Sequence, residues 1–178
     1  MTRRTRDRSR RECRALVAEL ELPDPFDLAE LCATVGRERG RPVVLTATPM
    51  VMGNLCGMWM GTAQADYVFY EQNTSFLHQQ HIVFHELGHI LRRHSPKRIL
   101  GADVARALAP VVEPGEVERV LGRDTYNDED EYEAELIATL ILRRVAHHAA
   151  VEVPEAVDPR SDDVVARIAR SLSRGDHA

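Results

Sequence analysis

Residues 83–91 read Val-Phe-His-Glu-Leu-Gly-His-Ile-Leu, and this stretch is the most informative part of the chain. Its histidines, His85 and His89, are four residues apart, so on a helix they share one face at about 5–6 Å. Two neutral imidazoles at that separation can both reach one zinc ion at roughly 2.0–2.1 Å. Glu86 points beside such an ion and can take a proton from a water molecule there. We therefore predict a zinc site with His85 and His89 as metal ligands and Glu86 as general base.

The alternative for this stretch is a pair of histidines that are merely solvated or hydrogen-bonded in the core. Two neighbouring residues argue against it. Gly88 costs about 1 kcal/mol relative to alanine in a helix interior, which indicates that something packs closely there. Glu86 lies in an otherwise apolar run, where an unpaired carboxylate is unfavourable. Both features favour the metal site.

A catalytic zinc ion usually has three protein ligands, so a third is expected downstream. Residues 124–135 contain seven acidic residues and no basic one. Most of them suit a solvated helix start, because carboxylates favour the N-terminal turn. Glu133 differs, since helical spacing puts it on an apolar stripe with Leu136, Ile137 and Leu140. A buried carboxylate needs a partner, so we predict Glu133 as the third ligand, with Glu129 as its nearest rival.

The flanking sequence predicts an α+β fold in which helices outnumber strands. Apolar residues at helical spacing predict helices over about 9–20, 25–36, 75–93 and 128–148, and from Ser161 onward. Val-, Leu- and Thr-rich or aromatic runs predict three strands, at 42–48, 55–60 and 67–70. The polar turn at 61–66 makes a hairpin of the last two, so we expect a small, mostly antiparallel sheet near the site helix. Residues 95–125 are punctuated by Pro and Gly and are expected to form an insertion or extra helices.

Length and composition point to one globular domain. The chain has 178 residues, with 44% hydrophobic and 29% charged, which excludes collagen-like, coiled-coil and wholly disordered proteins. Residues 1–14 hold seven of the arginines, although the net charge is −5, so the remainder is strongly acidic. We therefore expect a disordered basic tail at 1–8 and a single domain at 9–178. A domain built to bind nucleic acid directly is not expected.

The three cysteines, Cys13, Cys32 and Cys56, include no C-x-x-C pair. Neither a disulfide framework nor a cysteine zinc site is therefore expected, and buried or partly buried thiols in a reducing compartment are the better interpretation. No apolar run approaches the roughly 18 residues that a membrane span needs. We predict a cytoplasmic protein without a membrane partner.

The motif at 85–89, followed by Glu133-Ala134 and Ile137-Ala138, resembles the ImmA/IrrE family of gluzincin-type metallopeptidases. That family reads H-E-x-x-H, then a helix with E-A-[N/D]-x-F-A-x-x-L-L; here Glu135 and Ile137 replace its Asn/Asp and Phe. The resemblance implies a zincin-like fold, Zn²⁺ bound by His85, His89 and Glu133, and Glu86 as base. It also implies an intracellular endopeptidase that cuts a helix-turn-helix transcriptional regulator, which here would be a separate protein.

A second hypothesis keeps the metal without catalysis, as a zinc-bound sensor or regulator-binding module. Glu86 argues against it, because a pure binding site needs no general base. Other residues have open roles: His94, Tyr126 or Tyr132 could donate to a developing oxyanion. His81 could contact substrate or an extra metal, although a partly exposed polar face is the simpler reading. Residues 55–60 could form an edge strand that pairs with an extended peptide, although core packing is the default.

Overall fold

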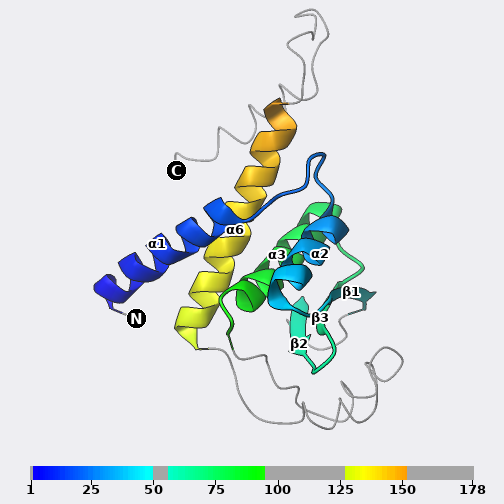
Figure 1. Cartoon of the computed structure of the whole chain (residues 1–178), viewed down its shortest axis with the longest axis horizontal. Helices are drawn as coiled ribbons and strands as arrows, with labels where there is room; N and C mark the ends of the chain where they lie inside the picture. The colour runs from blue at the N-terminus through cyan, green and yellow to red at the C-terminus, as the bar shows by residue number, and fades with distance from the viewer. Residues whose placement is uncertain (1, 50–55, 95–126, 152–178) are drawn as a thin grey trace, which may run out of the picture.

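The computed structural model describes residues 2–49, 56–94 and 127–151. These residues form four helices and a three-stranded sheet, so the α+β class is confirmed (Figure 1). In chain order the elements are α1 (Arg3–Glu19), α2 (Leu28–Arg39), β1 (Val43–Thr48), β2 (Gly57–Gly61), β3 (Asp66–Glu71), α3 (Phe76–Leu91) and α6 (Asp128–Val151). The predicted elements within 95–125 and after Ser161 lie outside the described residues.

The sheet is mixed, which corrects the expectation of a mostly antiparallel one. Its strand order is β1-β3-β2. The predicted hairpin is present, because β2 pairs antiparallel with β3, with Gly57 opposite Tyr70. However, β1 pairs parallel with β3, with Val43 opposite Asp66. The hairpin could be predicted from its polar turn, whereas the position of β3 between β1 and β2 follows from no pattern within one segment.

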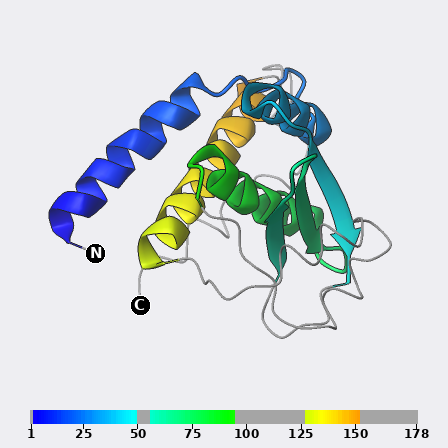
Figure 2. The same ribbon diagram turned by 60° about the horizontal axis from the view of Figure 1, so that its bottom comes forward.

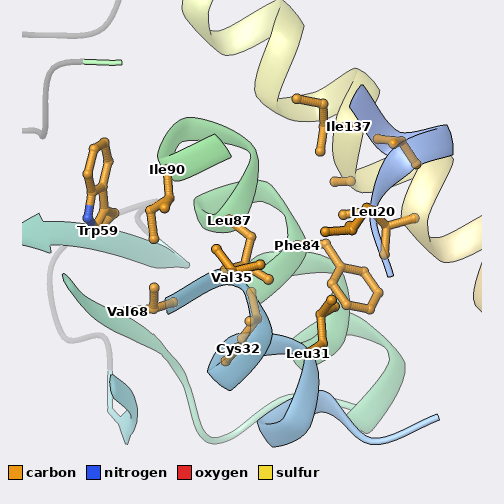
Figure 3. Close-up of a cluster of buried hydrophobic side chains, with 14 of the residues drawn as sticks. Leu20, Leu31, Cys32, Val35, Trp59, Val68, Phe84, Leu87, Ile90 and Ile137 are labelled. Carbon is orange, nitrogen blue, oxygen red and sulfur yellow. The ribbon is translucent and has the colours of Figure 1, made fainter. Parts of the chain in front are cut away.

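Helix α3 lies at the centre of the fold, with α2, α6 and the sheet around it (Figures 1 and 2). The Ser75 hydroxyl caps its start by accepting a hydrogen bond from the backbone N–H of His78. The side chains that it buries include Val83, Phe84, Leu87 and Ile90. Figure 3 shows Phe84, Leu87 and Ile90 meeting side chains from the neighbouring elements, among them Leu31, Cys32, Val35, Trp59, Val68 and Ile137. This apolar packing holds α3 in place.

Helix α1 begins at Arg3, so the residues expected to form a disordered tail make its first turns. Thr2 caps the helix by accepting from the N–H of Thr5. The Arg6 guanidinium lies 5.3 Å from the ring centroid of Tyr132 in α6, a cation–π contact. The basic sequence carries no apolar stripe before Cys13, so helical periodicity could not reveal this turn. The contact between Arg6 and Tyr132 of α6 joins this first part of α1 to another helix, and the sequence alone does not show it.

A buried charge cluster joins α2, β1 and the hairpin. The Asp66 side chain is fully buried and accepts from Arg39 Nε at 2.6 Å and from Arg41 Nε and Nη2 at 2.7 Å each. The indole N–H of Trp59 donates to the same carboxylate at 2.8 Å. Arg41 also donates to the backbone oxygen of Thr62 in the hairpin turn. Charge-assisted bonds of this kind connect the start of the sheet to the turn that precedes β3.

Two of the three cysteines are buried as predicted. Burial raises the pKa of the Cys13 thiol to about 11 and that of the Cys32 thiol to about 12. Such thiols are neutral at physiological pH and act as small apolar side chains in the core. Cys56 is exposed, next to the start of β2.

None of the helices in the described parts of the chain is both long enough and apolar enough to cross a membrane.

Candidate metal centre

The two motif histidines converge on one point. His85 Nε2 and His89 Nε2 lie 3.2 Å apart. Two ligands of a tetrahedral ion, each at roughly 2.0–2.1 Å from it, are about 3.3 Å from each other. His89 is fully buried, and the His85 side chain is 20% exposed, so the pair lies at the rim of the core. Helix α3 therefore presents both nitrogens in an arrangement that a single ion can bridge.

A carboxylate from α6 completes a three-residue group that could hold a metal ion. Glu131 Oε2 lies 3.4 Å from His85 Nε2, and the ligand atoms of His85, His89 and Glu131 are all within 4.8 Å of one another. The Glu131 side chain is 41% exposed, so the open side of the group faces solvent. Two imidazoles, one carboxylate and an open position match the donor set of a catalytic zinc site.

The start of α6 places Glu131 at this point. Asn127 Oδ1 accepts from the backbone N–H groups of Glu129 and Asp130 at 2.9 Å and so caps the helix. Four acidic residues follow in the first turn, where carboxylates favour the helix dipole. The acidic residues at the start of α6 thus stabilise the first turn of the helix. One of them, Glu131, also supplies the third side chain of the group that could hold a metal ion.

Helices α3 and α6 touch at Gly88. A Cβ added to Gly88 would lie 2.8 Å from Ala134 Cα and 2.9 Å from Ala134 O. The close packing that the sequence indicated beside Gly88 is therefore confirmed. This contact sets the spacing of the two helices and hence the distance from the histidines to Glu131.

Gly88→Ala is expected to lower the free energy of unfolding by about 1–3 kcal/mol, the usual effect of overpacking. The clash is with backbone atoms of Ala134, which cannot rotate away, and it outweighs the gain of about 1 kcal/mol in helix propensity. Urea unfolding checks the result, with Thr139→Ala on the exposed side of α6 as the matched control. A stabilised Gly88→Ala protein would contradict the close approach.

Glu133, predicted as the third ligand, is not part of the three-residue group. It is buried as expected, at 4% exposed, but its partner is a guanidinium. Arg92 donates from Nε to Oε2 at 2.6 Å and from Nη2 to Oε1 at 3.0 Å, and His94 Nε2 lies 3.1 Å from Oε2. Burial works to raise the pKa of Glu133, but hydrogen bonds from Arg92, Ser9 and His94 hold that pKa below its usual value. The carboxylate is therefore charged and well bonded without an ion.

The rival candidate, Glu129, is not part of the three-residue group either. Its Oε1 accepts from Ser9 Oγ of α1 at 3.3 Å. The sequence argument missed Glu131 because it followed the large apolar residues of α6. The alanines of α6 mark the face that packs against α3 better than the large apolar residues do. Ala134 and Ala138 are fully buried, as small residues at a close helix contact are. Glu131 precedes Ala134 by three residues and so lies on that same face, one turn earlier.

Each motif histidine has a contact on its second ring nitrogen. His85 Nδ1 lies 3.5 Å from Glu135 Oε2, and His89 Nδ1 lies 3.0 Å from His94 Nδ1. Metal-binding histidines characteristically engage their second nitrogen in this way, which holds the ring orientation. The same Glu135 oxygen is 3.3 Å from His81 Nε2, so His81 belongs to the surroundings of the group.

A cavity of about 220 Å³ opens beside the motif. Its lining combines residues of α3, residues at the start of β2 and one residue of α6, namely Cys56, Gly57, His78, His81, Ile82, His85, Glu86 and Glu135. Glu86 is 3% exposed, and a Cβ on Gly57 would lie 3.0 Å from its Oε1. Because Gly57 has no side chain, the Glu86 carboxylate fits between α3 and β2. Among the described strands, β2 lies at one edge of the sheet, as the strand-addition hypothesis requires.

The residues considered for oxyanion binding are dispersed. His94 contacts His89 and Glu133, and the Tyr132 ring lies under Arg6, on the side facing α1. Tyr126 lies outside the described residues. His94 therefore contacts the second ring nitrogen of His89, and Tyr132 is part of the contact between α1 and α6.

Comparison with family models, with curated proteins and with solved structures returns no match for this chain. The case for its function therefore depends on the two helices and on the geometry described above.

Proposed function

We propose that the protein is a zinc-dependent endopeptidase with a zincin-like fold, similar in its site to the ImmA/IrrE metallopeptidases. One observation carries the proposal: the Nε2 atoms of His85 and His89 lie 3.2 Å apart, and a Glu131 oxygen lies 3.4 Å from the first. Three donors converge on one point beside a cavity that Glu86 also lines. The sequence motif and the geometry thus support the same chemistry.

Zinc fits the donors better than other common cations. Mg²⁺ and Ca²⁺ prefer sites made of oxygen atoms, whereas imidazole nitrogens suit zinc and its transition-metal neighbours. His85 and His89 would supply two nitrogens and Glu131 one oxygen, three protein ligands as in a typical catalytic zinc site. When bound there, zinc supplies Lewis acidity, which polarises a carbonyl group and makes a water molecule easier to deprotonate.

Glu86 has the position of a general base. It follows His85 directly, so its side chain points beside the converging nitrogens and toward the same cavity. Its carboxylate would take a proton from the attacking water and deliver it to the departing amine, which balances the hydrolysis of a peptide bond. Gly57 leaves the space that this carboxylate occupies, so the edge strand β2 and the base form one wall of the cavity.

We infer that the substrate is a separate helix-turn-helix transcriptional regulator and that cleavage takes place in the cytoplasm. The regulator follows from the resemblance to the ImmA/IrrE motifs. An extended segment of it could pair with β2, whose outer edge adjoins the cavity. The buried, neutral thiols of Cys13 and Cys32 suit a reducing compartment.

Removal of the metal tests the proposal. The purified protein, loaded with zinc, is incubated with purified helix-turn-helix regulators from the same organism, and fragments are identified by mass spectrometry. We expect cleavage that stops when a chelator removes zinc and returns when zinc is restored, because without the ion no Lewis acid polarises the carbonyl group or makes the water easier to deprotonate.

Two outcomes would contradict the proposal. Cleavage that persists without metal would assign the activity to other residues. Zinc-dependent binding of the regulator without any cleavage would instead favour the second hypothesis, a catalytically silent sensor or regulator-binding module.

A further inference from the structure

A series of short contacts leads from the metal group into the protein interior. His89 Nδ1 lies 3.0 Å from His94 Nδ1, and His94 Nε2 lies 3.1 Å from Glu133 Oε2. Arg92 holds Glu133 through two hydrogen bonds and also donates to Glu12 of α1 at 3.0 Å. The side chains of His94 and Glu133 are 7% and 5% exposed, so the contact between these two is shielded from water.

We propose that His94 and Glu133 are positioning residues, which hold His89 in the ring orientation and tautomer that can bind a metal ion. The inference rests on the metal site proposed above and gives Glu133 a role other than that of a ligand.

The proton positions follow from the contacts. A metal on Nε2 of His89 leaves Nδ1 as the ring nitrogen that carries the proton. That N–H must donate to His94 Nδ1, 3.0 Å away, so this nitrogen of His94 is the acceptor. A neutral His94 then carries its proton on Nε2 and donates it to the Glu133 carboxylate at 3.1 Å. Each donor therefore meets an acceptor, and one tautomer of each ring satisfies the whole series.

The backbone after α3 brings His94 to this place. Arg93 has a φ of 57°, in the left-handed region, which is unfavourable for a residue other than glycine. This residue reverses the chain so that the N–H of His94 donates to the backbone oxygen of His89 at 3.0 Å. The strained turn sets the His94 ring against the ring of His89, with centroids 5.1 Å apart.

The positive charge of Arg92 strengthens the hydrogen bond from His94 to Glu133. Arg92 keeps Glu133 ionised, and an ionised carboxylate is a strong acceptor for the Nε2 proton of His94. A well-polarised His94 accepts more strongly from His89, which in turn raises the basicity of the nitrogen that faces the metal. Glu133 can thus strengthen metal binding without touching the ion.

Histidine tautomers give the direct test. Two-bond ¹⁵N–¹H correlation spectra of the zinc-loaded protein, labelled with ¹⁵N-histidine, distinguish Nδ1–H from Nε2–H rings. We expect His89 as Nδ1–H and His94 as Nε2–H, with peaks assigned from His94→Gln and His89→Gln. A His94 ring protonated on Nδ1 would overturn the inference.

Metal affinity gives the second test and separates positioning from ligation. Glu133→Gln is expected to weaken zinc binding about 10–100-fold, the usual effect of losing an outer partner of a ligand. With cobalt in place of zinc, its saturated absorption spectrum should match that of the wild type, because the ligand set is unchanged. Glu131→Gln should alter that spectrum. Glu30→Gln, the same change on the exposed side of α2, is the control and should bind zinc as the wild type does.

The outcomes distinguish this inference from the proposed function. If Glu133→Gln changes the cobalt spectrum as the loss of a ligand does, Glu133 is a ligand and the inference fails while the metal site stands. An unchanged affinity for zinc in Glu133→Gln also overturns it. A wild-type protein that binds neither zinc nor cobalt would overturn the metal site itself, and the positioning role with it.

Discussion

Glu86→Gln is expected to reduce peptide hydrolysis by about 10²–10⁴-fold, the contribution of a well-placed general base. Glutamine has the same shape but cannot accept a proton from water at neutral pH. The pocket around Glu86 should keep its geometry, since the amide is nearly isosteric with the carboxylate between Gly57 and α3. The loss should therefore fall on the rate of the chemical step rather than on folding.

The zinc content of Glu86→Gln should equal that of the wild type, because Glu86 lies outside the three-residue donor group. Elemental analysis of the purified variant measures this directly. Glu30→Gln, an identical change on the exposed side of α2, serves as the control and should cleave at the wild-type rate. Wild-type activity in Glu86→Gln would remove the general base from the mechanism, and a loss of zinc would show that Glu86 helps to hold the ion.

Asp66→Asn is expected to lower the free energy of unfolding by about 3–5 kcal/mol. The carboxylate is fully buried between the guanidinium groups of Arg39 and Arg41. An asparagine can still accept from Trp59, but it leaves two partly buried positive charges without a counter-charge. Removing one partner of a buried ion pair is costly for this reason, even where the intact pair contributes little.

Urea unfolding with linear extrapolation measures the change, and Asp7→Asn on the exposed face of α1 should stay within about 0.5 kcal/mol of the wild type. If Asp66→Asn is too unstable to purify, Arg41→Lys provides a milder loss, because lysine cannot make both contacts of the guanidinium. A change below about 1 kcal/mol in Asp66→Asn would mean that solvent reaches the two arginines and replaces the carboxylate.

The Asp66 cluster also bears on the site. Arg41 bridges Asp66 and the backbone of Thr62, so it holds the turn between β2 and β3. The β2 strand begins at Gly57, directly against Glu86. Loosening this turn should therefore disturb the wall of the cavity, and weaker activity in Asp66→Asn is expected even where the protein remains folded.

The residues of α3 could be predicted because their relation is local. The separation of four residues between His85 and His89 dictates a shared helix face, and the neighbouring position of Glu86 follows from the same helical period. Close packing at Gly88 could also be anticipated, since glycine inside a helix needs a reason. These inferences required no knowledge of what lies around the helix.

The residues of α6 could not be assigned in the same way. Glu129, Glu131 and Glu133 all lie within two turns, and each faces a different neighbour. The tertiary structure orients the helix through the contact of Gly88 with Ala134, which turns Glu131 toward the histidines. Ser9 of α1 meets Glu129, and Arg92 at the end of α3 meets Glu133.

By itself, the sequence determined the α+β class, the site helix with His85, Glu86 and His89, and the burial of Glu133. Each of these depends on periodicity along one segment. The tertiary structure decided the parallel pairing of β1 with β3, the ordering of α1 and the carboxylate that joins the two histidines. Those depend on which segments meet in space and on how each helix is rotated, and no spacing within a single segment contains that information.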